Sequence, residues 1–169
     1  MGVWQGMLAE RNSVEAYTGV GEKKAREQAP VMKAAVSGLN RLPVHSGRVY
    51  NGQPYTLPLA HGGAVDRRQV DMFVWGCFPI GRIIRQDTFF STAKSIGASF
   101  ISKPTHNLAW VIDEIRTGRD IQPISDKPGE EEVLFPPGAK FMVQSFDTSN
   151  VTLTTGDLAG KVVIHLVEL

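Results

Sequence analysis

The chain has 169 residues, of which 42% are hydrophobic and 21% charged, so it has the length and composition of one globular domain rather than of a disordered tail or fibrous repeat. Its 18 basic and 17 acidic side chains leave a formal net charge of +1, so no overall field draws it toward nucleic acid or anionic lipid. A single cysteine, Cys77, excludes internal disulfides, and with four scattered histidines it forms no zinc-binding pattern.

Helical patterns occupy the first quarter of the chain. Asn12 followed by Glu15 has the spacing of a capping box, and Pro30 is suited to the first turn of a further helix. Apolar side chains then recur at helical intervals until Pro43, which prevents continuation. We therefore predict a helical N-terminal part over residues 1–43.

After Pro43 the pattern changes to short apolar runs separated by turn residues, which predicts a β core over residues 44–169. Repeats, low-complexity tracts and breaks in composition are absent from the sequence, so we expect one domain. The predicted strands cover residues 48–50, 72–78, 82–92, 133–135, 141–146, 151–154 and 162–167.

Several residues have ordinary structural interpretations. Trp75 and Trp110 are predicted to lie in the core, Cys77 to be a small buried apolar residue, and Gly62-Gly63 to form a turn. Residues 108–115 fit either a helix or a buried strand, and periodicity alone does not decide between them.

Three consecutive acids, Glu130, Glu131 and Glu132, precede a short apolar run. Taken alone, such a run is typical of a solvated patch or of charges that protect the start of a strand. If a strand begins at Glu130, however, Glu130 and Glu132 project from one face and Glu131 from the other. Two neighbouring carboxylates can divide roles, one stabilising positive charge on a sugar and one acting as a base, because proximity separates their pKa values.

A second pattern joins Gly81-Arg82-Ile83-Ile84 to the run from Phe89 to Ser95, which contains Ser91 and Thr92. An apolar strand that ends in hydroxyl residues is common and is most often structural. It becomes informative together with the acidic run downstream, because the two patterns occur in a defined order.

In this order the segments resemble the bacterial mono-ADP-ribosyltransferase toxins of the Arg-Ser-Glu class, which move ADP-ribose from NAD onto a protein side chain. Tyr17-Thr18-Gly19, residues 81–92 and residues 130–141 carry the resemblance, which extends from about Tyr17 to the end of the chain. It implies an α+β ADP-ribosyltransferase-like fold with N-terminal helices packed on two mainly antiparallel β-sheets that flank an NAD cleft. It also favours a strand for residues 108–115.

The resemblance assigns roles to four residues. Glu132 matches the class's glutamate, which hydrogen-bonds the ribose and stabilises the oxocarbenium-like centre. Ser91 is expected to position Glu132 and support the nicotinamide side of NAD, with Thr92 as a helper. Glu130 is expected to orient and deprotonate the acceptor, and glutamate at this position accompanies arginine acceptors in the class.

One position departs from the class. Its Tyr-Arg-Gly element falls on Tyr50-Asn51-Gly52, so asparagine stands where an NAD-binding arginine is expected, and an arginine occurs at Arg48 instead. Arg48 and Asn51 lie on opposite faces of a regular strand, so Arg48 can substitute only if a bulge turns it. We favour Arg48, because a guanidinium can donate two parallel hydrogen bonds to a phosphate, and keep Asn51 as the alternative; Gly52, Ser91 and Thr92 complete the expected NAD site.

We therefore expect an enzyme that uses NAD as a substrate, needs no metal and modifies arginine on a target protein. By resemblance, residues 121–129 are expected to recognise the acceptor and residues 93–107 to close over NAD. The alternatives are an NAD glycohydrolase, an RNA-directed transferase, which the near-neutral charge disfavours, and a catalytically impaired binding module that lost NAD affinity through Asn51.

The expected setting is a secreted or injected effector that acts in the cytoplasm of a target cell, with a cognate immunity protein as a further partner and no membrane association. The sequence contains no apolar stretch long enough to span a bilayer, and its first residues lack the regions of a signal peptide. Delivery is therefore expected to depend on another part or partner.

Overall fold

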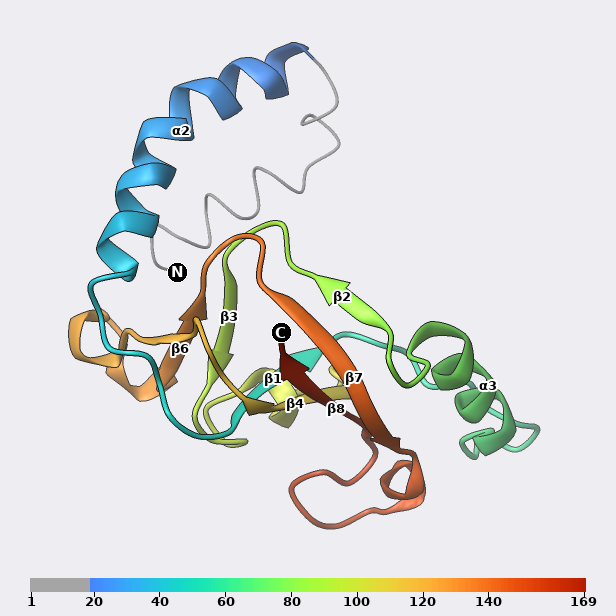
Figure 1. The fold of residues 1–169 in the computed structure, drawn as a ribbon. Coiled ribbons are helices and arrows are strands. Elements are labelled where there is room, and N and C mark those ends of the chain that lie inside the picture. The colour runs from blue at the N-terminus through green and yellow to red at the C-terminus, as the bar shows by residue number, and fades with distance from the viewer. Residues whose placement is uncertain (1–18) are drawn as a thin grey trace.

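The computed structural model describes residues 19–169 (Figure 1). The predicted capping box at Asn12 and Glu15, and the Tyr17-Thr18 pair, lie outside these residues. The α-helices of the described part are α2 (Gly19–Leu39) and α3 (Arg67–Cys77). Its strands are β1 (Val49–Gln53), β2 (Ile83–Arg85), β3 (Phe90–Ala93), β4 (Leu108–Glu114), β5 (Arg119–Asp120), β6 (Glu132–Phe135), β7 (Lys140–Asp147) and β8 (Val162–Glu168).

The strands form one sheet in the order β2-β7-β8-β4-β1-β3-β6-β5. Neighbouring strands are antiparallel except β4 and β8, which run parallel. Strands β1 and β3 meet at a single residue pair, Tyr50 with Ala93. The two expected sheets are therefore joined at this pair, with five strands on one side and three on the other.

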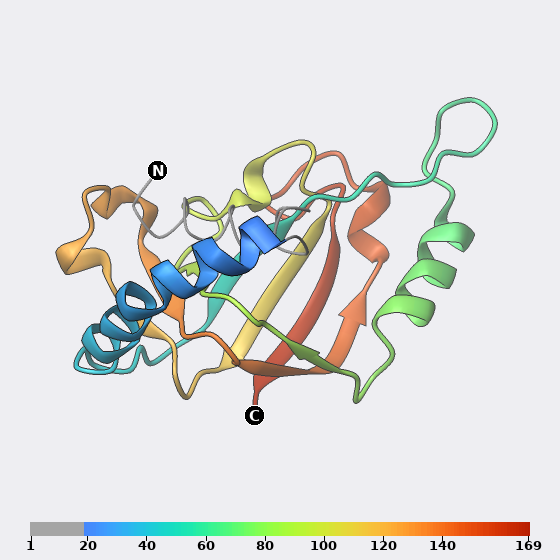
Figure 2. The ribbon, with the colours of Figure 1, turned by 90° about the horizontal axis from the view of Figure 1, so that it is seen from above.

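Helix α2 confirms a helical segment before Pro43, but it does not begin at Pro30. It starts at Gly19 and continues through Pro30, which is exposed. Its buried Ala35 and Leu39, one turn apart, pack in a cluster with three residues near β3, β5 and β6: Phe89, Ile121 and Leu134. Figure 2 shows α2 lying across this part of the sheet.

The strand predicted over residues 72–78 is wrong, because this segment belongs to α3. Asp66 caps the helix by accepting a hydrogen bond from the Gln69 amide at 3.2 Å. Val70 and Val74, spaced four residues apart, are fully buried in the main core. This cap and spacing outweigh the strand preference of the aromatic residues between them.

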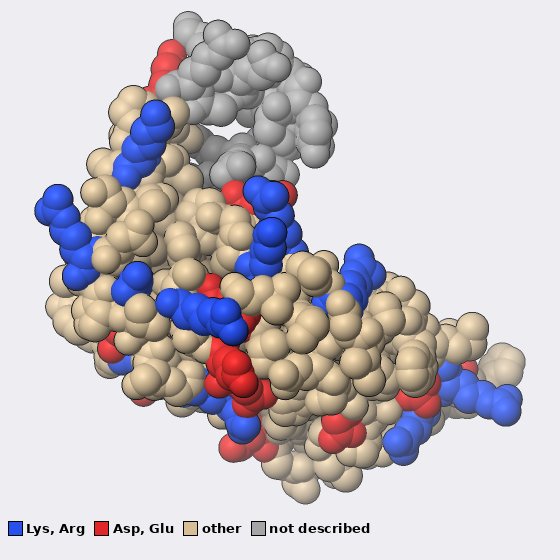
Figure 3. Space-filling model, viewed as in Figure 1, with Lys and Arg blue, Asp and Glu red and all other residues tan. Residues whose placement is uncertain are grey.

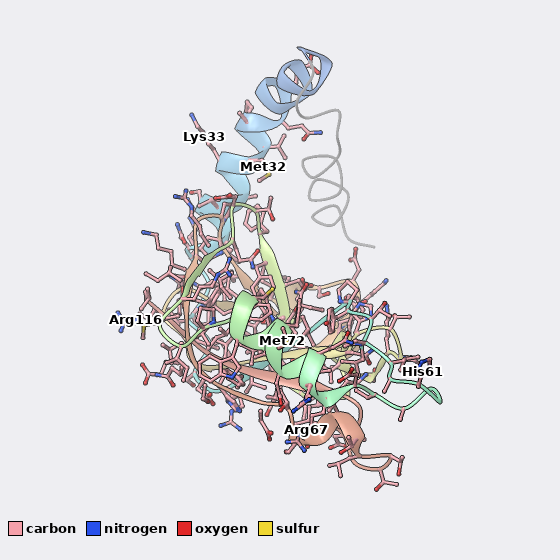
Figure 4. All side chains as sticks on the ribbon, turned by 90° about the vertical axis from the view of Figure 1, so that its right-hand side faces the viewer. Met32, Lys33, His61, Arg67, Met72 and Arg116 are labelled. Carbon is pink, nitrogen blue, oxygen red and sulfur yellow. The ribbon has the colours of Figure 1, made fainter. Side chains whose placement is uncertain are left out.

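The outer side of α3 carries large apolar side chains. Met72 is 74% exposed and Trp75 is 60% exposed, so the prediction that Trp75 lies in the core is wrong. Trp75 instead stacks edge-to-face on Phe146 with ring centroids 5.2 Å apart. Cys77, the last residue of α3, is half-buried rather than fully buried. Figure 4 faces this helix and shows Met72 and Arg67 on its outer side.

Two further strand predictions need correction. Residues 82–92 form two strands, because the chain leaves β2 at the sheet edge and returns as β3 between β1 and β6. Residues 151–154 do not form a strand: a short 3-10 helix, η5 (Ser149–Thr152), includes Val151 and Thr152, and the next two residues lie in a loop. The predicted turn at Gly62-Gly63 is confirmed, since both glycines have positive φ in a loop closed by the Ala60 amide and Ala64 carbonyl.

Strand β4 confirms the strand that the resemblance favoured for residues 108–115. Leu108, Trp110 and Ile112 join the main core, whereas Ala109 and Val111 join a cluster on the other face. Because the parallel pair β4–β8 is largely buried on both faces, its sequence is mostly apolar, as in Leu108–Ile112 of β4. That pattern lacks the alternation that identifies a half-buried strand. None of the helices over residues 19–169 is long and apolar enough to cross a membrane.

Candidate active site

A pocket that is open to solvent lies where β1, β3 and β6 approach one another. It brings together residues from three distant parts of the sequence, including both patterns identified above. Its lining residues are Tyr50, Asn51, Ser91, Thr92, Ala93, Ala98, Ser99, Phe100, Glu130 and Glu132.

The pocket occurs at the point where the sheet divides. Asn51 spans this division, because its side-chain amide donates a hydrogen bond to the Ser91 carbonyl at 2.8 Å. The Asn51 side-chain oxygen in turn accepts a hydrogen bond from the Gln53 side chain. Asn51 therefore holds β1 to β3 beside the pocket.

The two carboxylates reach the pocket by a different route from the one predicted. Glu130 ends a short 3-10 helix, η4 (Pro128–Glu130), and β6 begins only at Glu132. Between them Glu131 adopts a left-handed conformation with φ of 47°. The alternation expected of a strand beginning at Glu130 is therefore wrong, yet the turn at Glu131 still brings Glu130 and Glu132 to one pocket.

Glu130 and Glu132 have different surroundings. Burial raises the pKa of Glu132 above its ordinary value; a hydrogen bond with the Ser91 side chain opposes this rise, and the negative charge of Glu130 adds to it. Glu130 is more exposed and lies 3.5 Å from the Lys127 Nζ. The pocket thus contains one sheltered carboxyl group bound to a serine and one carboxylate near solvent.

The raised pKa of Glu132 predicts a pH-dependent contribution to stability. A carboxyl group with a raised pKa stabilises the fold below its ordinary value of 4.5, and this contribution is lost as pH rises through the higher pKa. Glu132→Gln is therefore expected to raise the thermal midpoint by a few degrees above pH ~7 and to leave it unchanged near pH ~4. Thermal unfolding across this range measures the effect, with Glu131→Gln as the control. An equal shift at both pH values would contradict this assignment.

Thr92 and Gly52 have structural roles beside the pocket. The Thr92 hydroxyl donates a hydrogen bond to the Val133 carbonyl at 2.8 Å, which joins β3 to β6. A Cβ atom on Gly52 would lie 2.4 Å from the backbone of Phe100 and Ile101. The short 3-10 helix η2 (Phe100–Ser102) can therefore pack on β1 only because residue 52 is glycine.

Gly52→Ala is expected to destabilise the protein by about 1–3 kcal/mol, because the added methyl group displaces the backbone of η2. Denaturant unfolding measures this loss. Gly38→Ala is the matched control, because a Cβ at residue 38 in α2 meets no neighbouring atom. A Gly52→Ala variant as stable as Gly38→Ala would rule out this close packing.

Arg48 does not lie among the pocket residues. Its Nε donates a hydrogen bond to Asp113 Oδ1 at 2.6 Å, and its side chain is 53% exposed. The other Asp113 carboxylate oxygen lies 3.2 Å from His165 Nδ1. The structure thus brings Asn51 together with Ser91, Glu130 and Glu132, whereas Arg48 interacts with Asp113 and with the pocket residue Tyr50 but does not itself line the pocket.

The loop after β3 lies within residues 93–107, which were expected to close over NAD, but the sequence assigned no role to its individual pocket residues. Ala98, Ser99 and Phe100 line the pocket, and the Lys103 Nζ lies 3.8 Å above the Phe100 ring. Ser99 begins η2 by accepting a hydrogen bond from the Ile101 amide at 3.3 Å. The only local signal for this turn is that serine, which is too common to identify a site. Over residues 19–169 the structure contains no cluster of side chains that could hold a metal ion.

Known proteins resemble this chain in sequence and in fold. The sequence is 30% identical over 112 residues to a candidate NAD+–arginine ADP-ribosyltransferase, Mav, from Mycobacterium avium (strain 104); this match covers 66% of the chain and 13% of Mav. The fold matches that of the ADP-ribosyltransferase Vis from Vibrio splendidus, solved in complex with agmatine, with a TM-score of 0.67, 18% identity and coverage of 98% of this chain and 68% of that one.

An ADP-ribosyltransferase from Clostridium botulinum matches with a TM-score of 0.62, 16% identity and coverage of 94% of this chain and 85% of that one. Residues 48–166 match the family described as ADP-ribosyltransferase exoenzyme. This matched segment contains every residue that lines the pocket. The chain therefore belongs to the ADP-ribosyltransferase exoenzyme family.

Proposed function

We propose that residues 1–169 form one catalytic domain that transfers ADP-ribose from NAD to an arginine of a target protein and releases nicotinamide. The observation that carries this proposal is the pairing of Glu130 with Glu132 in one pocket, where Glu132 is also bound to Ser91. The name of Mav assigns arginine as its acceptor, and Vis is solved with agmatine, which carries the same guanidinium group.

The charges in the pocket suit the reacting groups of both reactants. Its described lining includes two carboxylates and no basic side chain, so it favours positively charged groups. The nicotinamide ring of NAD and the guanidinium of arginine both carry positive charge. The same negative field would stabilise the oxocarbenium-like ribose that forms as the bond to nicotinamide breaks.

Glu132 is the residue we assign to the ribose. Its carboxylate would accept a hydrogen bond from a ribose hydroxyl and stabilise the developing positive charge, while Ser91 fixes its orientation. The nicotinamide leaves with the bonding electron pair, so the ribose carbon becomes open to attack. Glu132 is half-buried, which limits screening of its charge by water.

Glu130 is the residue we assign to the acceptor. A guanidinium is protonated at neutral pH and is a poor nucleophile until a base takes or shares its proton. Glu130 lies nearer solvent than Glu132, where a protein side chain can reach it. The attacking nitrogen would then bond to the ribose carbon as its proton passes to Glu130.

We assign NAD contact to Asn51 in preference to Arg48, because Asn51 lines the pocket and Arg48 is paired with Asp113. Asn51→Ala is expected to weaken NAD binding about tenfold, the effect of losing one hydrogen bond of about 1.4 kcal/mol. Arg48→Met is expected to change it less than about twofold. Calorimetric titration with NAD measures both, and a larger effect of Arg48→Met would return the role to Arg48.

Two loops beside the pocket, residues 121–129 and 93–107, are assigned to binding the two reactants. Residues 121–129, the acceptor loop, precede Glu130 and are assigned to recognition of the target protein. Within residues 93–107, Ala98, Ser99 and Phe100 line the pocket, and we assign the covering of NAD to these three residues. Gly52, Ser91 and Thr92 would hold this arrangement together through the contacts described above.

The proposed setting is a toxin or effector that acts in the cytoplasm of a recipient cell, with a cognate immunity protein as a further partner. Similar folds occur in HopU1 of Pseudomonas syringae (TM-score 0.54, 22% identity) and in the type III effector XopAI of Xanthomonas axonopodis (TM-score 0.52, 20% identity). Figure 3 shows basic and acidic side chains interspersed on the face that it displays. This distribution favours a protein acceptor over a nucleic acid.

Incubation of the protein with labelled NAD and cell lysate tests the proposal. Label that is attached to protein and released by an arginine-specific ADP-ribosylhydrolase would support it. Label in RNA would indicate a nucleic-acid acceptor, and free ADP-ribose alone would indicate an NAD glycohydrolase. A wild-type protein that consumes no NAD would overturn the enzymatic assignment and favour a binding module.

A further inference from the structure

Lys94 follows β3 directly and lies outside the pocket lining, so it is not expected to touch NAD. Its partly buried Nζ donates hydrogen bonds to Asp120 Oδ2 at 2.6 Å and Gln122 Oε1 at 2.7 Å. Burial favours the neutral form of Asp120, but the bonds from Lys94 and from the Gln122 amide hold its pKa below its ordinary value. Lys94 is therefore anchored to the residues at the start of the acceptor loop.

The same residue also reaches the end of that loop. The Lys94 amide donates a hydrogen bond to the Glu131 carbonyl at 3.1 Å. Gln122, which Lys94 holds through its Oε1, donates from Nε2 to the Pro128 carbonyl at 2.9 Å. Pro128 is the first residue of η4, the turn that ends at Glu130.

Glu130 depends on this backbone for its position. Its amide donates to the Lys127 carbonyl at 3.0 Å, and its carboxylate lies 3.5 Å from Lys127 Nζ, so both contacts come from the loop itself. Glu132, in contrast, begins β6, where it pairs with Ala93 across the sheet. A change in the loop would therefore move Glu130 while leaving Glu132 in place.

We propose that Lys94 is a positioning residue that braces the acceptor loop through Asp120 and Gln122 and so places Glu130 for reaction with the guanidinium acceptor. This role rests on the proposed transferase function. It predicts that loss of the Lys94 side chain impairs transfer to the acceptor and spares cleavage of NAD, because only the acceptor side of the pocket depends on the brace.

Lys94→Met removes both side-chain hydrogen bonds and keeps the apolar stem. It is expected to lower kcat/KM for transfer to agmatine between about 10- and 100-fold, the range expected when a reacting group is displaced by about 1 Å. Its rate of NAD hydrolysis without acceptor and its KM for NAD are expected to stay within about twofold of wild type. Lys94→Arg, which keeps the charge and the donors, is expected to recover part of the transfer.

Lys140→Met is the matched control, because Lys140 is exposed at the start of β7, away from the pocket lining. It is expected to match wild type in both reactions. Equal loss of transfer and hydrolysis in Lys94→Met, unchanged transfer, or no recovery in Lys94→Arg would each overturn the proposal.

Amide hydrogen exchange separates this proposal from the proposed function. Lys94→Met is expected to speed exchange over residues 121–131 and not over residues 141–146 of β7. If the wild type proves inactive, faster exchange in the loop would still support the brace while the transferase assignment fails. Unchanged exchange over residues 121–131 would overturn the brace whatever the activity.

Discussion

Glu132→Ala is expected to lower both ADP-ribose transfer and NAD hydrolysis by about 100- to 1,000-fold, because both reactions pass through the same oxocarbenium-like ribose. Initial rates of nicotinamide release, with and without agmatine, measure the two losses. The position of Glu132 against Ser91 in the pocket is the physical basis for this expectation.

Glu131→Ala is the control for Glu132→Ala, because Glu131 is the adjacent acid but does not line the pocket. We expect it to keep both activities within about threefold of wild type, once unfolding measurements show that the variant is folded. Retention of NAD hydrolysis by Glu132→Ala would remove Glu132 from the step that breaks the bond to nicotinamide.

Glu130→Ala is expected to separate the two reactions. Transfer to agmatine should fall by about 100-fold or more, the usual contribution of a positioned general base. Hydrolysis of NAD should stay within about tenfold of wild type. Water can attack the oxocarbenium-like carbon before it loses a proton, whereas a guanidinium needs a base first. The quantity to measure is the ratio of ADP-ribosylated agmatine to free ADP-ribose.

Lys127→Met is a useful companion to Glu130→Ala, because Lys127 lies 3.5 Å from the Glu130 carboxylate. This variant removes a positive charge beside Glu130 and keeps the Glu130 carboxylate. We expect the rate of transfer to agmatine to change less than about threefold. Equal losses of transfer and hydrolysis in Glu130→Ala would contradict the assignment of Glu130 to the acceptor.

The two acids that we assign to catalysis were identifiable in the sequence because they belong to one run of three glutamates, Glu130-Glu131-Glu132. The resemblance brought Ser91 and Glu132 into one site, and the pairing of β3 with β6 accounts for their proximity. The prediction that Glu130 and Glu132 point the same way relied on strand alternation, but Glu130 precedes the strand and reaches the pocket through the turn at Glu131. No pattern of residue types reports that Glu131 adopts a left-handed conformation, which depends on the loop before it.

Other parts of the structure depend on contacts between distant residues. Helix α3 was predicted as a strand because its apolar residues match a strand composition, whereas its fully buried side chains, Val70 and Val74, follow helical spacing. The brace from Lys94 joins residues 26 and 28 positions away along the chain. Our proposal that Asn51 rather than Arg48 contacts NAD likewise depends on a distant residue, because Arg48 is bonded to Asp113 of β4.

The most direct test of the central claim is mass spectrometry of agmatine incubated with NAD and the wild-type protein, with nicotinamide measured in the same reaction. We predict that ADP-ribosylated agmatine and nicotinamide form together and that Glu132→Ala produces neither above background. Nicotinamide released without any modified agmatine, or no nicotinamide at all, would contradict an ADP-ribosyltransferase that acts on a guanidinium.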